Sequence, residues 1–197
     1  MNEIQQAPPR KVSAQTAIDG LIGATFGDFW SWAYSDILSN VNRSVFGEFI
    51  VAHALGVSAG LRVEWNAFDI EYNRRTIEVK TSGYCQRWSQ RALSLVTFDI
   101  SKKIAWFAKT NTYSKEQIRA ADVYVFALHS QKDCSRANAS DINQWCFYAT
   151  LKSEIEGTFL DQKSVALEVL TKRLNLRQLS VLDLRAEVDM LIQKLAP

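Results

Sequence analysis

Two carboxylates and a lysine lie near one another in the first half of this 197-residue sequence. Asp69 ends the run Asn-Ala-Phe-Asp, and Glu78 and Lys80 alternate with apolar residues in Ile-Glu-Val-Lys. Mg²⁺ is commonly bound by one or two carboxylates together with the oxygens of a substrate phosphate. A nearby ammonium group can stabilise the negative charge that develops on a phosphate during hydrolysis. These residue types predict metal-assisted chemistry on a phosphate ester, provided that the fold brings them together.

A β-hairpin would bring the three side chains onto one face. Residues 63–72 and 75–82 are each expected to form a strand, with a two-residue turn between them. Asp69 and Glu78 are equally distant from that turn, so they lie opposite each other, with Cβ atoms roughly 4.5–5.5 Å apart. Lys80, two residues beyond Glu78, shares their face. The other face is expected to carry the apolar side chains Phe68, Ile70, Ile77 and Val79.

Like charges that oppose each other directly destabilise a hairpin unless a cation lies between them. A divalent cation between Asp69 and Glu78 would resolve this repulsion. The alternative interpretation is a solvated polar face, on which Lys80 bridges the two acids.

A helix over residues 44–55 is expected to precede the hairpin, with a cap at Asn42 or Ser44 and an end at Gly56. Its single acid, Glu48, lies on an apolar stripe, where an unpaired charge is unfavourable. Glu48 is therefore either part of the same site or one half of a structural ion pair.

This set of residues resembles the PD-(D/E)xK superfamily of nucleases, the restriction-endonuclease-like phosphodiesterases. The matching residues are Asp69, Glu78 and Lys80, with Glu48 in the place of the acid that family members carry on the preceding helix. One departure is Phe68, which stands where the family often has proline. The direct resemblance extends over about residues 44–82.

The resemblance implies a fold, an activity and roles for the site residues. The implied fold is an α/β restriction-endonuclease-like core, in which helices flank a mixed central sheet, with extra N- and C-terminal helices. The implied activity is Mg²⁺-dependent phosphodiester hydrolysis, with Mn²⁺ as a substitute and DNA as the preferred substrate. The metal would be held by Asp69, Glu78 and the backbone carbonyl of Val79, with Glu48 bound directly or through water. Lys80 would orient the attacking water.

The segment after Lys80 is polar, aromatic and basic, and it predicts contacts with nucleic acid. Gln86, Arg87 and Arg91 are suited to phosphate, and Trp88 is suited to stacking on a base. An ordinary crossover segment explains the same residues equally well.

The remaining pattern is that of one domain. Residues 1–12 are expected to form a flexible tail, and residues 13–197 a single domain whose core covers about 44–152. Residues 122–129 and 145–151 are expected to be buried strands, and about 163–196 a helical segment. Less regular segments are assigned as follows: 92–100 and 104–109 as strands, and 114–119 as a helical turn.

Composition limits the class of protein only loosely. The net charge of +2 is close to balance, so any basic surface must be local. Three cysteines and two histidines show no zinc-ligand spacing, and the odd cysteine count favours a reducing cytosol. No apolar run approaches the ~20 residues that span a bilayer. We therefore expect a cytoplasmic protein without membrane segments.

Other interpretations of the same residues stay open. The fold could serve as a non-catalytic nucleic-acid-binding or assembly module, or as an RNA-processing nuclease. A chain with one site would need a second copy to cut both strands of a duplex, so a homodimer is expected for that activity. Residues 26–34 or the leucine-rich C-terminal helix are candidates for its interface.

Overall fold

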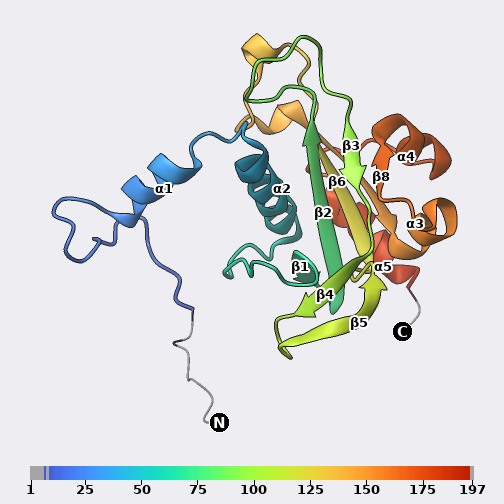
Figure 1. Cartoon of the computed structure of the whole chain (residues 1–197), viewed down its shortest axis with the longest axis horizontal. Helices are drawn as coiled ribbons and strands as arrows, with labels where there is room; N and C mark the ends of the chain where they lie inside the picture. The colour runs from blue at the N-terminus through green and yellow to red at the C-terminus, as the bar shows by residue number, and fades with distance from the viewer. Residues whose placement is uncertain (1–6, 8, 196–197) are drawn as a thin grey trace.

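The structure is a computed structural model that describes residue 7 and residues 9–195. Most of the predicted tail, residues 1–6 and 8, lies outside the described residues, as do residues 196–197. The described chain has a mixed α/β architecture (Figure 1).

A four-stranded mixed sheet forms the centre, in the order β1-β2-β6-β7. Its strands are β1 (Ile70–Tyr72), β2 (Arg75–Gly83), β6 (Val123–His129) and β7 (Trp145–Leu151). β1 pairs antiparallel with β2, β2 pairs parallel with β6, and β6 pairs antiparallel with β7. Every residue of β6 and β7 is buried, as expected for continuous apolar runs on strands that are covered on both faces. The predicted mixed sheet is confirmed.

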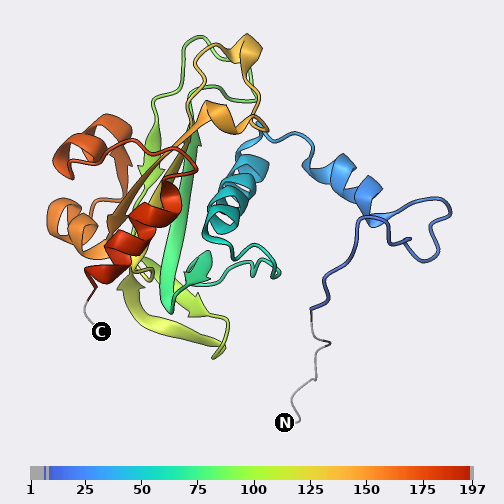
Figure 2. The same cartoon turned by 180° about the vertical axis from the view of Figure 1, so that it is seen from behind.

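Helices cover the sheet on both faces (Figures 1 and 2). On one face, α2 (Asn40–Leu55) and α5 (Leu184–Gln193) pack against the sheet in one apolar cluster. On the other face, a second cluster joins the sheet to α3, α4, β3 and β8. The bounds of these elements are α3 Lys152–Phe159, α4 Leu167–Arg173, β3 Thr97–Asp99 and β8 Ser164–Ala166. The predicted C-terminal leucine pattern packs in the first of these clusters, because Leu184, Val188 and Leu191 of α5 are buried there.

The remaining elements lie at the margins of the sheet. β4 (Lys103–Phe107) and β5 (Thr112–Ile118) form a separate hairpin, and η1 (Cys134–Arg136) and η2 (Ile142–Gln144) are short 3₁₀ turns. The helix α1 (Phe26–Tyr34) extends away from the body in Figure 1, and none of its residues is buried.

Several sequence-based assignments are wrong in type or length. The predicted helical turn at 114–119 is strand β5, because its residues pair with β4 across a turn at Asn111, which adopts a positive φ of 51°. Only Ile70–Tyr72 of the predicted strand 63–72 pairs, and only Thr97–Asp99 of the predicted strand 92–100. The helical segment predicted at 163–196 begins with strand β8, which is ordered by pairing with β3. Phe68 packs with the second cluster, on the face opposite to the predicted one.

The helix α2 is longer than its sequence predicted. It begins at Asn40, because the hydroxyl of Ser39 accepts a hydrogen bond from the Asn42 backbone N–H and caps the first turn. It ends as predicted at Gly56, whose φ of 78° permits a left-handed cap.

A disulfide joins Cys85, just after β2, to Cys134 in η1. Cys146 is the remaining free cysteine, and it is buried. Since only one thiol is left unpaired, the odd cysteine count no longer favours a reducing compartment.

A close contact at Gly47 sets the position of α2 against β2. A methyl group at Gly47 would lie well inside contact distance of Thr81 Oγ, so the helix can approach this strand only because residue 47 has no side chain. The Thr81 hydroxyl is itself buried without a hydrogen-bond partner. The contact therefore leaves little room for the Thr81 side chain to move.

Gly47→Ala is expected to lower the free energy of unfolding by about 1–2 kcal/mol, because overpacking costs more than the gain of about 1 kcal/mol in helix propensity. The double variant Gly47→Ala/Thr81→Ala should recover the loss, because it removes the obstructing hydroxyl and methyl groups. Gly47→Ala/Thr81→Val keeps the bulk at position 81 and should not recover it. Urea unfolding of the four proteins measures these differences, and a more stable Gly47→Ala would show that α2 does not need the close approach.

Candidate active site

Asp69 lies at the open edge of β2, immediately before the short strand β1. The observed pairing of Ile70 with Ile77 has the register that the sequence predicts, but the pairing ends there, and the Asp69 backbone N–H donates to the Ile77 carbonyl at 3.1 Å. The next ladder bond involves a side chain, because the Val79 N–H donates to Asp69 Oδ2 at 2.7 Å. The carboxylate of Asp69 is thereby fixed against the strand that carries Glu78 and Lys80.

Glu78 and Lys80 project from β2 into the same cleft as Asp69. All three side chains line a cleft of about 350 Å³ that is bordered on its far side by the β4–β5 hairpin. The ammonium group of Lys80 forms an ion pair with Glu78, and both side chains are largely buried, with about 20% of their surface exposed. The structure thus brings together the three residues that the sequence predicted to share a face.

The electrostatic environment of Asp69 is strongly unfavourable for a bare carboxylate. Its burial, together with the negative charges of Glu78 and Glu48, raises the pKa of Asp69 to about 7. The Val79 N–H and the charge of Lys80 lower the pKa but do not outweigh these effects. A positive charge placed beside Asp69 would relieve the repulsion.

Lys80 carries a positive charge at neutral pH. Burial alone would lower the pKa of its ammonium group, but the negative charges of Glu78 and Asp69 more than compensate and raise that pKa above its ordinary value. In this resting arrangement Lys80 is therefore a fixed cation rather than a proton acceptor.

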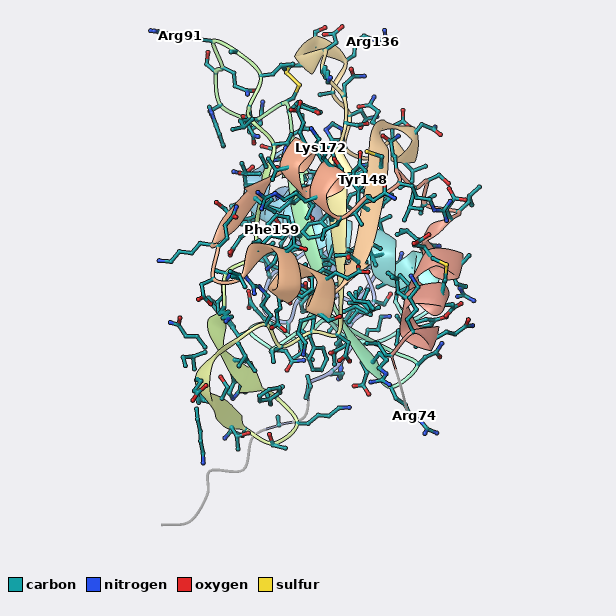
Figure 3. The ribbon with its side chains drawn as sticks, turned by 90° about the vertical axis from the view of Figure 1, so that its right-hand side faces the viewer. Arg74, Arg91, Arg136, Tyr148, Phe159 and Lys172 are labelled. Atoms are coloured by element: carbon teal, nitrogen blue, oxygen red, sulfur yellow. A yellow bond between two sulfur atoms is a disulfide. The ribbon has the colours of Figure 1, made fainter. Side chains whose placement is uncertain are left out.

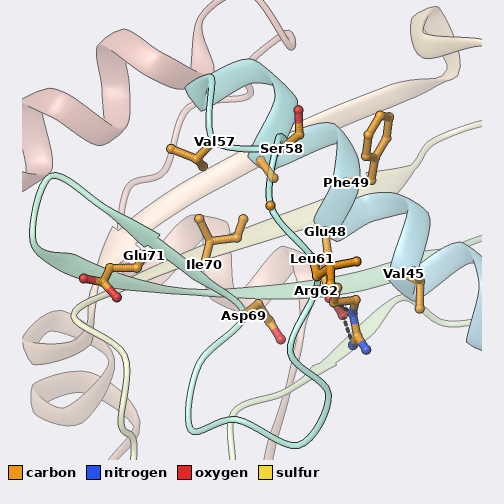
Figure 4. Close-up of a pocket in the computed structure, with 12 residues that line it drawn as sticks. Val45, Glu48, Phe49, Val57, Ser58, Leu61, Arg62, Asp69, Ile70 and Glu71 are labelled. Atoms are coloured by element: carbon orange, nitrogen blue, oxygen red, sulfur yellow. Dashed lines mark hydrogen bonds and ion pairs between the residues drawn. The ribbon is translucent and has the colours of Figure 1, made fainter. Parts of the chain in front are cut away.

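Glu48 reaches the same region from α2, on the other side of Asp69. Its carboxylate accepts two hydrogen bonds from the guanidinium of Arg62, at 2.5 and 2.9 Å, and its side chain is 13% exposed. Figure 4 shows this ion pair beside Asp69 in a second pocket, which α2 and residues 57–71 line. Glu48 forms an ion pair, as one of the two sequence-based alternatives predicted, and its negative charge also raises the pKa of Asp69.

The donor groups fit a small divalent cation of the Mg²⁺ type. Asp69 and Glu78 offer carboxylate oxygens, and Val79 turns its backbone toward the open edge, as its N–H bond to Asp69 shows. Mg²⁺ needs only one or two carboxylates, because water and substrate phosphate complete its shell. In residues 9–195, no three His, Cys, Asp or Glu side chains come close enough to hold a metal by themselves.

The segment predicted to contact nucleic acid, residues 86–91, lies away from the cleft of Asp69. Gln86 accepts a hydrogen bond from the buried Arg43 at 2.8 Å, and Arg87 forms an ion pair with Asp36. Trp88 and Arg91 are exposed, but with Gln86 they line a separate pocket beyond the end of β2. Figure 3 shows Arg91 at the end of the molecule opposite the hairpin tip, Arg74. The structure therefore does not bring these four residues into the cleft of Asp69.

Several residues of the two pockets were missed from the sequence. They are Arg62, Trp65, Lys103, Trp106 and Tyr124. Tyr124 pairs in register with Glu78 across the parallel strands, and burial raises the pKa of its phenol. The regular pattern of β6 could have placed Tyr124 beside Glu78, whereas the others depend on irregular loops and on a hairpin that was assigned wrongly.

The chain matches no family model, no curated protein sequence and no solved structure. Among the residues that the structure describes, no helix has the length and apolar character to cross a bilayer.

Asp69→Asn is expected to stabilise the metal-free protein at pH 8 by at least about 1 kcal/mol, or about 2–4 °C in melting temperature. The folded-state pKa of about 7 lies above the ordinary value of 3.8, so the folded wild type binds a proton more tightly than the unfolded chain. Its stability should fall as the pH rises from 4 to 7, and the asparagine variant should lack this fall. Thermal melts in EDTA from pH 4 to 8 test this, and parallel pH profiles for the two proteins would contradict it.

Proposed function

We propose that this protein is a metal-dependent phosphodiesterase that hydrolyses nucleic acid, with DNA endonuclease activity as the specific expectation. The observation that carries this proposal is the convergence of Asp69, Glu78 and Lys80 in one cleft at the open edge of β2. Two hard oxygen donors beside a fixed cation suit a phosphate ester and its bound metal.

Each site residue has a distinct part in this proposal. Asp69, Glu78 and the Val79 carbonyl would hold a Mg²⁺ ion, and Glu48 would add an oxygen donor directly or through water. When bound there, the ion would supply polarisation of the phosphate and a lowered pKa of a coordinated water. Lys80 orients the attacking water and stabilises negative charge on the phosphate, because its ammonium stays protonated in the cleft.

The arrangement of elements supports the resemblance to PD-(D/E)xK nucleases. A helix that bears Glu48 precedes an antiparallel hairpin that bears Asp69, Glu78 and Lys80, and the hairpin belongs to a mixed sheet with helices on both faces. We propose on this basis that the core is restriction-endonuclease-like.

A non-catalytic nucleic-acid-binding module is the second candidate, and one observation favours it. Glu78 is paired with Lys80, and Glu48 is paired with Arg62, so two of the three acids already have a cationic partner. In that case the acids would be structural, and the site would bind phosphate through its cations alone. An RNA-processing nuclease is a variant of the first proposal that differs only in substrate.

Asp69→Asn and Lys80→Met are expected to reduce metal-dependent cleavage by at least about a hundredfold, through lost metal binding and lost charge stabilisation respectively. The assay uses plasmid, linear and single-stranded DNA and RNA, each with Mg²⁺, Mn²⁺ or EDTA. Glu71→Gln is the matched control, because Glu71 lies two residues from Asp69 but pairs with Lys109 on the surface. Its activity should equal that of the wild type.

Metal binding gives a second, independent readout of the same proposal. Mg²⁺ should raise the melting temperature of the wild type and of Lys80→Met, but not that of Asp69→Asn. If the wild type cleaves no substrate with either metal and Mg²⁺ leaves its melting temperature unchanged, the non-catalytic interpretation replaces the enzyme.

Cleavage of both strands of a duplex is expected to require two copies of the chain, because each copy offers one site. The leucines of α5 are buried in the core, which leaves the exposed aromatic side chains of α1 as the available surface. Light scattering with and without duplex DNA measures the assembly. A protein that cuts both strands together while remaining a monomer would rule out the homodimer.

A further inference from the structure

Two tryptophans line the cleft that contains Asp69, Glu78 and Lys80. Trp65 lies in the loop that leads into Asp69, and 84% of its surface is exposed. Its backbone adopts a positive φ of 65°, a conformation that costs free energy for a bulky residue and that is enriched at functional sites. A side chain so exposed contributes little to the core, so folding alone does not account for it.

Trp106 lies on β4, at the border of the same cleft. Its indole N–H donates to Asn111 Oδ1 at 3.1 Å, within the β4–β5 hairpin, and this bond fixes the orientation of the ring. Lys103, on the same strand, also lines the cleft; its ammonium group pairs with Asp99 at 2.6 Å, and its side chain is more than half exposed. The cleft therefore combines aromatic surfaces with the cations Lys80 and Lys103.

We propose that this cleft binds an unpaired nucleotide, so that the preferred substrate is a single strand, a flap or a frayed end rather than an intact duplex. This inference rests on the function proposed above. In a duplex the faces of each base are covered by its neighbours, whereas an unpaired base can stack on an indole ring. Trp65 and Trp106 supply these rings, and Lys80 and Lys103 face the adjoining phosphates.

The test measures binding apart from hydrolysis. Asp69→Asn serves as the parent protein, without metal, and fluorescence anisotropy follows oligothymidine, oligouridine and a blunt DNA hairpin. The parent should bind the single strands more tightly than the hairpin. Adding Trp65→Ala should weaken single-strand binding about tenfold and leave hairpin binding unchanged, because the lost interaction is stacking on an unpaired base. Trp65→Phe should retain most of the affinity.

Trp88→Ala is the matched control, because Trp88 is 58% exposed but lies in a separate pocket with Gln86 and Arg91. It should leave single-strand binding unchanged. Thymidine and uridine strands bound equally would indicate recognition of the base face, and a preference for either would identify the 2′-hydroxyl of the sugar or the 5-methyl group of the base as a further determinant. Equal losses from Trp65→Ala and Trp88→Ala, tighter binding of the hairpin, or no binding of any strand would overturn the inference.

The outcomes separate this inference from the proposed nuclease activity. If the wild type cleaves but Trp65→Ala has no effect on binding, the nuclease proposal stands and the stacking site fails. If single strands bind through Trp65 but nothing is cleaved, the cleft is a binding site without turnover.

Discussion

The position of α2 against β2 depends on the absence of a side chain at Gly47. The helix meets the strand at Thr81, and a β-carbon on residue 47 would collide with the buried hydroxyl there. Glu48 is the next residue of the helix, and Lys80 precedes Thr81 on the strand. This one contact therefore sets how far the acid on the helix lies from the charged side chains on the sheet. Packed interiors transmit such constraints because they contain little free volume.

The second feature that shapes the site is the shortness of β1. Because β1 begins only at Ile70, the edge of β2 is uncovered beyond that point, and the carboxylate of Asp69 takes the place of a backbone acceptor for the Val79 N–H. The same edge leaves the carboxylate between two pockets, one on the side of α2 and one on the side of the β4–β5 hairpin. Burial and the two neighbouring acids, Glu78 and Glu48, then raise the pKa of Asp69. The short length of β1 therefore determines both where the Asp69 carboxylate lies and which charges surround it.

Regular segments could be predicted from the sequence, and irregular ones could not. The register of the hairpin follows from its turn at Asn73 and Arg74, since both adopt the positive φ that a tight turn requires and strand pairing is periodic. The buried strands β6 and β7 follow from continuous apolar runs. The hairpin of β4 and β5 was only half predicted, because β5 is polar and exposed and its pairing with β4 is a tertiary contact. Residues 63–69 were predicted as part of a strand but form a loop, so the positions of Arg62 and Trp65 were missed.

By itself, the sequence determined the register in which Ile70 pairs with Ile77, and it placed Glu78 and Lys80 on one face of β2, because local pairing geometry fixes those relations. It also indicated that Glu48 lies on an apolar stripe of a helix. Only the tertiary structure decided that Arg62 pairs with Glu48 and that Trp65 and Trp106 border the cleft of Asp69. It also decided that Gln86, predicted to contact nucleic acid, accepts a hydrogen bond from Arg43. Each of these contacts joins segments that lie far apart in the chain or involves a residue in an irregular loop. Which residues meet is set by packing of the whole fold, and no local spacing in the sequence encodes it.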